Sequence, residues 1–225
     1  MEPLKLADDD DSFPEAVRTK THLRHARSHP LAQAWFNYTI AAVIVVVILI
    51  PCIFIAIAIK LDSRGPVFFR QPRLGLHNRT FMMWKFRTMY VECSDIAGSQ
   101  LTMRNDPRIT RVGTWLRRWS LDELPQLLNV LDGTMALVGP RPHPLQAKVG
   151  DQLYAAVVPG YHHRHAVLPG ITGWAQINGW RGETVKPYQI EQRVAHDLEY
   201  VAKKSVRFDL QILLLTVVRL RKAAF

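Results

Sequence analysis

The chain divides into a polar N-terminal stretch, one long apolar run and a longer part in which apolar and polar positions alternate. The apolar run covers Trp35 to Ile59, 25 residues without a charged side chain. A helix rises about 1.5 Å per residue, so the run would reach roughly 37 Å, more than the ~30 Å hydrocarbon core of a bilayer. The pattern therefore predicts a membrane helix within residues 31–60. A signal peptide is disfavoured because a long polar stretch precedes the run and no small-residue cleavage site follows it.

Pro51 lies inside the apolar run, and two topologies fit it. Proline removes a backbone hydrogen bond and clashes with the preceding turn, so it favours a bend. Arginines and histidines precede the run, and Lys60 and Arg64 follow it, so the positive-inside tendency places both flanks on the cytosolic side. A re-entrant helix bent at Pro51 satisfies both observations, and an ordinary span with a tolerated kink is the alternative. Residues 1–30 are predicted as a mobile tail.

Shorter periodic segments follow in residues 61–225 and predict an α/β fold that is rich in helices and has a small sheet. Strands are predicted over residues 67–70, 80–87 and 135–138. Helices are predicted over residues 111–119, 124–131 and 191–201, and a C-terminal interfacial helix over residues 210–220, which are too few to span a membrane. Loops are predicted over residues 92–106, as a mobile segment, and over residues 159–182, as a Gly- and Pro-rich carrier of a binding site.

The chain is strongly basic, with 29 Lys and Arg residues against 19 Asp and Glu residues and a formal net charge of +10. This excess predicts an anionic partner: nucleic acid, anionic lipid headgroups or phosphorylated substrates. The apolar content of 48% excludes a generic disordered chain. Cys52 and Cys93 cannot build a disulfide framework, so we expect the working surface in a reducing, cytosol-like medium.

Ser120-Leu121-Asp122-Glu123-Leu124-Pro125 is the sharpest local feature. Proline is best tolerated in the first turn of a helix, so Pro125 predicts a helix start near Asp122 with two carboxylates at its positive end. That setting favours the ionised acids, and an ionised carboxylate can attack phosphorus or hold Mg²⁺. Ser120 and Glu123 also fit the S-x-x-E pattern of a capping box, which is the structural alternative.

Several cations are candidates for phosphate binding. Lys85 and Arg87 would point to one face of a predicted strand and could bind a diphosphate, or they could lie on a solvated edge strand. Arg117 precedes the acidic pair, and Arg181 lies in the Gly- and Pro-rich loop. Arg141 stands between two prolines that preset its backbone, either to grip a phosphate or in a plain turn. P-loop, Rossmann and hydrolase-elbow patterns are missing from the sequence, which disfavours those classes.

The order of these motifs resembles that of one family. The motifs lie within about residues 31 to 222: the apolar segment with Pro51, Lys60-Leu61-Asp62-Ser63, Gly65-Pro66-Val67-Phe68-Phe69, Lys85-Phe86-Arg87-Thr88-Met89, Asp106-Pro107-Arg108, Ser120-Leu121-Asp122-Glu123-Leu124-Pro125-Gln126, Gly139-Pro140-Arg141-Pro142, Arg164-His165 and Pro169-Gly170-Ile171-Thr172-Gly173-Trp174-Ala175-Gln176-Ile177-Asn178-Gly179. The chain is similar to the bacterial sugar transferases, the monotopic phosphoglycosyl transferases that begin exopolysaccharide, O-antigen and glycoprotein glycan assembly. So many motifs in one order make the resemblance specific.

The resemblance implies an exchange at phosphorus. A UDP-sugar gives its sugar 1-phosphate to undecaprenyl phosphate and UMP is released. Asp122 is the implied nucleophile of a two-step reaction through a phosphosugar-enzyme intermediate, with Glu123 beside it and Mg²⁺ bound at these two residues. Lys85, Arg117 and Arg141 match family positions that bind phosphate or help to order the site.

The family's membrane segment is a re-entrant helix broken at proline, which favours re-entry at Pro51. The resemblance thus implies a monotopic enzyme on the cytoplasmic face of the bacterial inner membrane, with residues 61–225 as its cytosolic catalytic domain. Its expected partners are undecaprenyl phosphate, a UDP-sugar, membrane lipids, downstream glycosyltransferases and a second copy of the chain as a homodimer, and nucleic acid is not among them.

Two features depart from the family pattern. Ile50 stands where some members have Ser before the kink proline, and many members carry further N-terminal spans, so we expect a form limited to the catalytic core. The stretch Trp180-Arg181-Gly182-Glu183-Thr184 resembles the hexose-using branch and suggests glucose or galactose. Two alternatives are a membrane glycosyltransferase that releases UDP and a non-enzymatic basic membrane adaptor or nucleic-acid binder.

Overall fold

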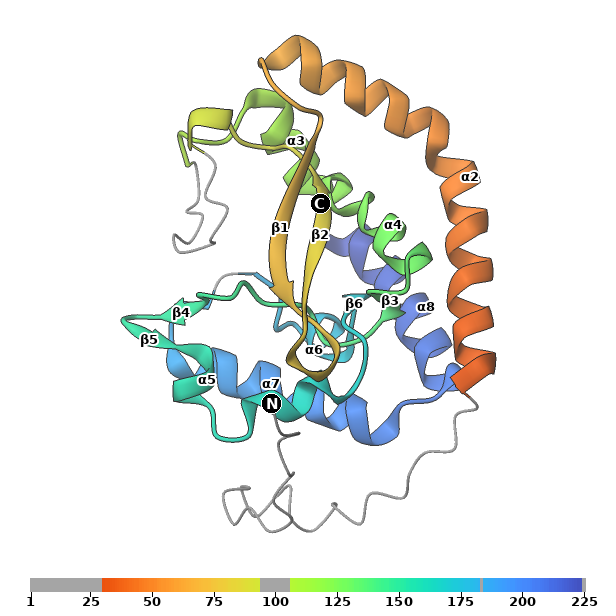
Figure 1. Ribbon diagram of the computed structural model, residues 1–225, viewed down its shortest axis with the longest axis vertical. Helices are drawn as coiled ribbons and strands as arrows, with labels where there is room; N and C mark the ends of the chain where they lie inside the picture. Colours follow the sequence, from red (N-terminus) through yellow and green to blue (C-terminus); the bar gives the residue numbers. More distant parts are fainter. Residues whose placement is uncertain (1–29, 94–105, 183, 224–225) are drawn as a thin grey trace, which may run out of the picture.

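The computed structural model describes residues 30–93, 106–182 and 184–223 (Figure 1). Most of the predicted tail and residues 94–105 of the predicted mobile loop lie outside this part. Helices dominate the described residues, and the strands among them form three separate two-stranded sheets. The helix-rich fold is thus confirmed, but three small sheets replace the single one that was expected.

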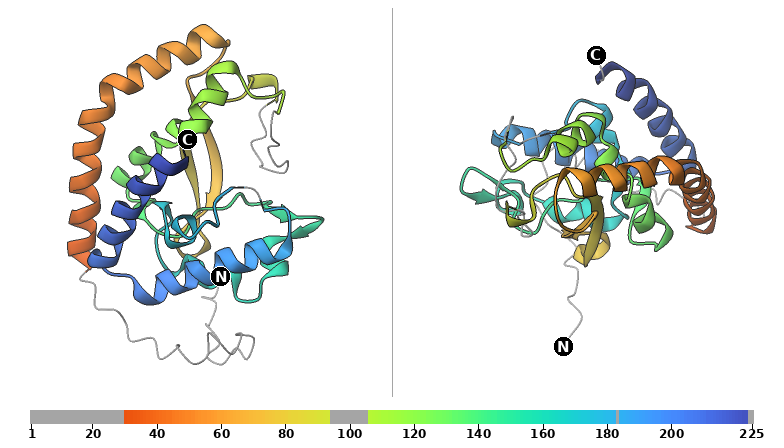
Figure 2. Two further views of the ribbon diagram at one scale, coloured as in Figure 1. Left: turned by 180° about the vertical axis from the view of Figure 1, so that it is seen from behind. Right: turned by 90° about the horizontal axis from the view of Figure 1, so that it is seen from above.

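The apolar run forms one continuous helix, α2 (Pro30–Asp62), which contains Pro51. By length and composition α2 could cross a membrane, and only 11% of its most apolar stretch is buried in the protein. Figures 1 and 2 show that α2 curves, with its first part beside α8 (Val206–Ala223) and its last part turned across one end of the molecule. So much exposed apolar surface on one helix is typical of a membrane-associated protein.

A β-hairpin runs through the middle of the molecule (Figure 1). Its strands β1 (Phe68–Leu74) and β2 (Thr80–Phe86) pair antiparallel and are joined by the short helix η1 (Leu76–Asn78). Both strands were predicted, and β1 extends four residues beyond the predicted range of 67–70. The hairpin supplies two cations, Arg73 and Lys85, from neighbouring strands.

Helix α3 (Arg111–Trp119) has the predicted bounds and packs closely on the segment after β2. The Thr110 side chain caps α3 by accepting a hydrogen bond from the Gly113 N–H at 2.9 Å. A Cβ on Gly113 would lie 2.1 Å from the Thr88 carbonyl oxygen, so only glycine allows this approach. Ser120 then adopts a left-handed conformation (φ 57°) and ends the helix.

Two short helices, η3 (Leu121–Glu123) and α4 (Gln126–Leu131), follow and lead to strand β3 (Ala136–Val138). β3 pairs in parallel with β6 (Gly170–Thr172), a strand within the segment predicted as a loop. That prediction is wrong because β6 is created by pairing with a distant segment, which local composition does not reveal. The remaining short elements are η2 (Val91–Cys93), β4 (Lys148–Val149), β5 (Gln152–Leu153), α5 (Tyr154–Val157), η4 (Tyr161–Ala166) and α6 (Trp174–Ile177).

The last two helices are α7 (Pro187–Lys203) and α8, and both extend beyond their predicted ranges. The main core lies where α2, α4, α8 and β3 meet, and its buried members include Ala41, Val130, Leu137 and Ile212. α8 exposes apolar side chains at Leu210, Leu214, Val217 and Val218, as an interfacial helix would.

Polar contacts join the first turns of α2 to the rest of the protein. Gln33 Nε2 donates to Asp209 Oδ2 of α8 at 2.6 Å. Asn37 Oδ1 accepts a hydrogen bond from the Leu137 N–H of β3 at 3.0 Å. The Tyr200 hydroxyl lies 2.7 Å from Asp209 Oδ1 and 3.0 Å from the Val138 carbonyl oxygen. The start of α2 is therefore part of the folded domain.

The last turns of α2 are joined to the same domain. Asp62 Oδ2 accepts a hydrogen bond from the Val112 N–H of α3 at 3.0 Å. Arg87 donates to the main-chain carbonyls of Ser63 and Arg64, with Nη2 2.8 Å from the Ser63 oxygen. Ile59 is buried among side chains of β2 and α3. Both ends of α2 are thus fixed to one domain.

We expect Tyr200→Phe to lower the free energy of unfolding by about 1–3 kcal/mol, because it removes the hydroxyl that serves the buried Asp209 carboxylate. Urea unfolding in a mild detergent measures the change. Tyr188→Phe is the matched control on α7, where the side chain is 51% exposed, and it should change stability by less than about 0.5 kcal/mol. Equal effects of the two substitutions would contradict the role given to Tyr200.

Candidate active site

The predicted acidic pair lies in η3, a single 3₁₀ turn between α3 and α4. A helical turn begins near Asp122, as predicted, with both acids in its first turn, but it is the 3₁₀ turn η3, and α4 begins only at Gln126, after Pro125. The capping-box alternative is contradicted. Ser120 makes no side-chain cap bond, and its Oγ accepts a hydrogen bond from Arg181 Nη2 instead.

Glu123 is held by two cations. Arg141 grips it with a bidentate fork, Nη1 donating to Oε2 at 3.1 Å and Nη2 donating to Oε1. Lys85 Nζ lies 3.6 Å from Oε1. Burial alone would raise the pKa of Glu123, but Arg141 and Lys85 outweigh it and hold this pKa well below its ordinary value. Glu123 is therefore ionised and committed to its partners.

Asp122 has a different environment, although it is adjacent in sequence. Its side chain is buried, with the residue 8% exposed, and among the described residues no group donates a hydrogen bond to its carboxylate. Burial raises the pKa of Asp122; Lys85 lowers this pKa, the charge on Glu123 raises it, and the net shift is upward. The expected preference for the ionised form therefore holds for Glu123, whereas the pKa of Asp122 is shifted upward, toward the protonated form.

Four of the five predicted cations are near this pair. Besides Lys85 and Arg141, Arg117 lies close enough to lower the pKa of Asp122, and its Nε donates to Thr88 Oγ1 at 2.9 Å. Arg181 reaches the turn through its bond to the Ser120 hydroxyl. The site therefore holds more positive than negative charge, which suits a phosphate ligand.

The fifth predicted cation, Arg87, is used differently. Its guanidinium donates to main-chain carbonyls at the end of α2, so the structure does not join it with Lys85 in the expected two-cation pocket. Strand alternation predicts on which side a residue lies, but it cannot predict that carbonyls from another element will take up the donors.

One cation of this region was missed from the sequence. Arg73 of β1 is half-buried, and its Nη1 donates to the Pro142 carbonyl oxygen at 3.2 Å. Burial and the charge on Arg141 together lower the pKa of Arg73 to about 9, although the charge on Glu123 acts to raise it. No motif marks Arg73, and the register of the hairpin places it on the same face as Lys85 but four residues along β1 from Phe69, the residue that pairs with Lys85.

The carboxylates of the acid pair are the candidate ligands for Mg²⁺ in this site. No group of three or more His, Cys, Asp or Glu side chains suited to a metal occurs in the described ranges. Mg²⁺ is commonly held by one or two carboxylates together with substrate phosphates and water, so a full protein cage is not required. Asp122 fits this mode because its oxygens are not engaged by a donor, whereas those of Glu123 are.

Known proteins point to one family. Residues 28–223 match the family described as Bacterial sugar transferase. The chain is 53% identical over 180 residues to an undecaprenyl-phosphate glucose phosphotransferase of Komagataeibacter xylinus. The aligned residues cover 80% of this chain and 34% of that relative. It is also 53% identical over 173 residues to a UDP-glucose:undecaprenyl-phosphate glucose-1-phosphate transferase of Escherichia coli (strain K12). This alignment covers 76% of the chain and 36% of that relative.

A third relative is the exopolysaccharide production protein PSS of Rhizobium leguminosarum bv. phaseoli, 49% identical over 166 residues, which covers 74% of this chain and 83% of the relative. The chain spans about a third of the length of the first two relatives. These matches confirm the resemblance that the order of the motifs indicated.

The opposite pKa shifts of the two acids predict opposite effects of neutralising them. Because the pKa of Asp122 is raised in the folded protein, its ionised form lowers the stability of the fold at pH 7. Asp122→Asn should therefore raise the melting temperature at pH 7. The increase should become smaller as the pH falls toward 3.8, the ordinary pKa of Asp. The lowered pKa of Glu123 means that its ionised form stabilises the fold above the ordinary Glu pKa, so Glu123→Gln should lower the melting temperature at pH 7. Thermal unfolding in nanodiscs measures both, and shifts of the same sign would refute the asymmetry.

Proposed function

The chain belongs to the bacterial sugar transferase family, and from this premise we propose that it transfers a sugar 1-phosphate from a UDP-sugar to undecaprenyl phosphate with release of UMP. The asymmetry of the acid pair carries the proposal: Glu123 is tied by a bidentate Arg141, while Asp122 beside it accepts no hydrogen bond within the described chain. The names of the relatives favour glucose over galactose as the sugar. The proposed step begins an exopolysaccharide or O-antigen.

In the proposed first step a carboxylate oxygen of Asp122 attacks the phosphorus that bears the sugar. The bond from this phosphorus to the bridging oxygen breaks, UMP leaves with that oxygen, and an acyl phosphate links Asp122 to the sugar. In the second step a phosphate oxygen of undecaprenyl phosphate attacks the same phosphorus, and the bond to Asp122 breaks. The carboxylate is restored, and the lipid carries a diphosphate-linked sugar.

The cations have separate tasks in this scheme. Lys85 and Arg117 favour the ionised form of Asp122 against burial. Arg181, which bonds the Ser120 hydroxyl, would bind the donor phosphates, and its position beside the acidic turn supports this role. Mg²⁺ is the expected cofactor at the acid pair, where Asp122 would hold it, Glu123 would lie beside it bound to Arg141, and the ion would offset the charge of the diphosphate.

The fixed ends of α2 support the re-entrant topology. Gln33 and Asn37 near its start and Asp62 at its end all bond the catalytic domain, so a straight crossing would carry buried polar contacts to opposite sides of the bilayer. Pro51 lies between them, within the exposed apolar part. We therefore place both ends on the cytoplasmic face of the inner membrane.

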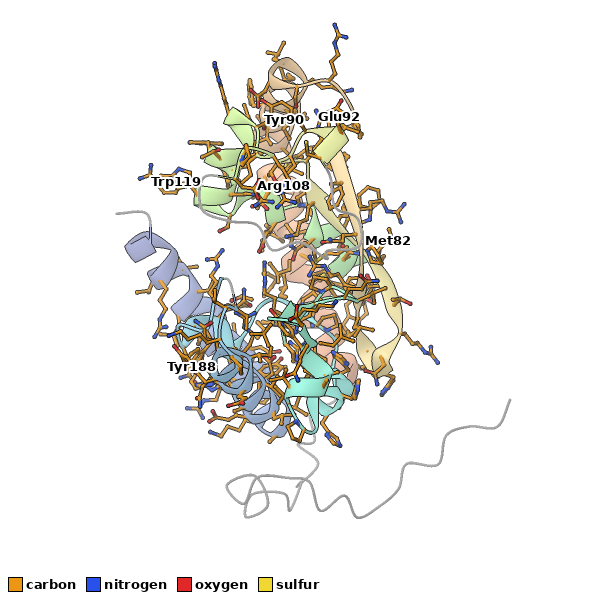
Figure 3. The ribbon with its side chains drawn as sticks, turned by 90° about the vertical axis from the view of Figure 1, so that its left-hand side faces the viewer. Met82, Tyr90, Glu92, Arg108, Trp119 and Tyr188 are labelled. Carbon is orange, nitrogen blue, oxygen red and sulfur yellow. The ribbon has the colours of Figure 1, made fainter. Side chains whose placement is uncertain are left out.

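The surface beside the site is suited to a lipid headgroup region. Trp115 and Trp119 of α3 are exposed, and Figure 3 shows Trp119 pointing away from the neighbouring elements. Arg111 and Arg118 share this helix, so aromatic and cationic groups occur together as they do at membrane interfaces. The polyprenyl phosphate would then reach Asp122 at headgroup depth.

Asp122→Asn should reduce UMP release by about a thousandfold or more, because an amide cannot form the acyl phosphate. The assay combines purified protein, undecaprenyl phosphate, Mg²⁺ and a panel of UDP-sugars. Intact-mass spectrometry of the wild type quenched with donor alone should show the sugar phosphate adduct, which Asp122→Asn should lack. The exposed Asp132 provides the control, since Asp132→Asn should leave turnover unchanged. Release of UDP would instead identify a glycosyltransferase, and the absence of turnover would favour a membrane adaptor.

Topology is tested with single cysteines at Lys20 and Arg64, after Cys52 and Cys93 are replaced by serine. Both cysteines should react with an impermeant maleimide from the cytoplasmic side only, because both flanks of α2 are expected there. Reaction of the two positions from opposite sides would establish an ordinary span.

A further inference from the structure

A fully buried ion pair, formed by Arg164 and Asp197, lies beside the segment that carries Arg141. Arg164 of η4 donates from Nε and Nη2 to Asp197 Oδ2 of α7, at 2.9 and 2.6 Å. The two side chains are 0% and 2% exposed. Removing both charges from water is so costly that a buried ion pair is weak evidence for a role in stability. The other hydrogen bonds of Arg164 indicate what else it does.

The Arg164 guanidinium also contacts the segment that carries Arg141, partly through the same Nη2 that donates to Asp197. Nη2 donates to the Arg141 carbonyl oxygen at 2.6 Å, and Nη1 lies 3.1 Å from His143 Nδ1. The same His143 nitrogen lies 2.7 Å from the Tyr161 hydroxyl. One side chain thus joins helix α7 to two residues of the Arg141 segment.

This segment is held through its carbonyls. Pro140 and Pro142 have no N–H, so they cannot donate main-chain hydrogen bonds. Each of the four consecutive carbonyl oxygens accepts one instead: Pro140 from Gly170 N at 3.0 Å, Arg141 from Arg164 at 2.6 Å, Pro142 from Arg73 at 3.2 Å and His143 from Leu74 N at 3.4 Å. The shortest of the four acts on the residue whose side chain grips Glu123.

We propose that Arg164, oriented by Asp197, is a positioning residue that sets the Arg141 guanidinium on Glu123. The inference rests on the proposed function, since it assigns Arg164 to the same site. Arg164 bonds neither acid of the pair and acts through the main chain of Arg141. A displacement of about 1 Å at a catalytic group can cost about a hundredfold in rate, so loss of this one bond has a measurable effect.

A double-mutant cycle on kcat for UMP release tests the proposal. Arg164→Lys keeps a positive charge beside Asp197 but lacks the fork that also reaches the Arg141 carbonyl. It should lower kcat about tenfold or more in the wild type and less than about twofold in an Arg141→Ala background. That background retains the carbonyl and lacks only the side chain being positioned. Equal losses in both backgrounds would show a merely structural role and overturn the proposal.

Val194→Ala is the matched control, because Val194 is buried on α7 one turn before Asp197 and packs in an apolar cluster that does not include Arg141. Its loss of kcat should be the same in both backgrounds. Asp197→Asn, which preserves the shape of the pair, replaces Arg164→Lys in the cycle if the lysine variant does not fold, with the same two outcomes.

A second readout does not need turnover. In thermal unfolding, the melting-temperature shift caused by Arg164→Lys should be smaller in a Glu123→Gln background than in the wild type, because the Arg141–Glu123 pair is then already lost. The shift caused by Val194→Ala should be unchanged. If the wild type releases no UMP, the proposed function fails, and additive shifts in this cycle would separately overturn the role of Arg164.

Discussion

The arrangement of the site depends on the bidentate grip of Arg141 on Glu123. This contact joins two short segments, the 3₁₀ turn after α3 and the proline-flanked stretch after β3, neither of which has enough regular structure to hold its own place. It also separates the roles of two adjacent carboxylates. Arg141 and Lys85 lower the pKa of Glu123 despite its burial, whereas burial and the charge on Glu123 leave the pKa of Asp122 raised.

Helix α2 serves two environments at once. Its outer face is apolar and exposed, as lipid contact requires, while its inner face packs in the main core and its ends carry polar bonds to α8, β3 and α3. The membrane segment is therefore part of the catalytic fold as well as its anchor. Arg87, expected at the phosphates, holds the end of this helix instead.

Features set by local chemistry could be predicted from the sequence, and features set by distant pairing could not. The apolar run, the amphipathic α3 and the hairpin strands follow from composition and period, and the motif order was sufficient to indicate the family. Strand β6 and the positions of Arg73 and Arg164 depend on register and on contacts between segments far apart in the chain. Nothing in the sequence marks Ser120, a non-glycine residue, for the left-handed conformation that separates α3 from η3.

The polar bonds at the start of α2 have a consequence for biosynthesis. Gln33 is translated 176 residues before its partner Asp209, and Asn37 is translated 100 residues before Leu137. The apolar helix thus leaves the ribosome long before the groups that satisfy its polar face exist. During that interval its amides depend on water, on lipid headgroups or on the insertion machinery. Final docking of the helix is consequently a late step of assembly rather than the first.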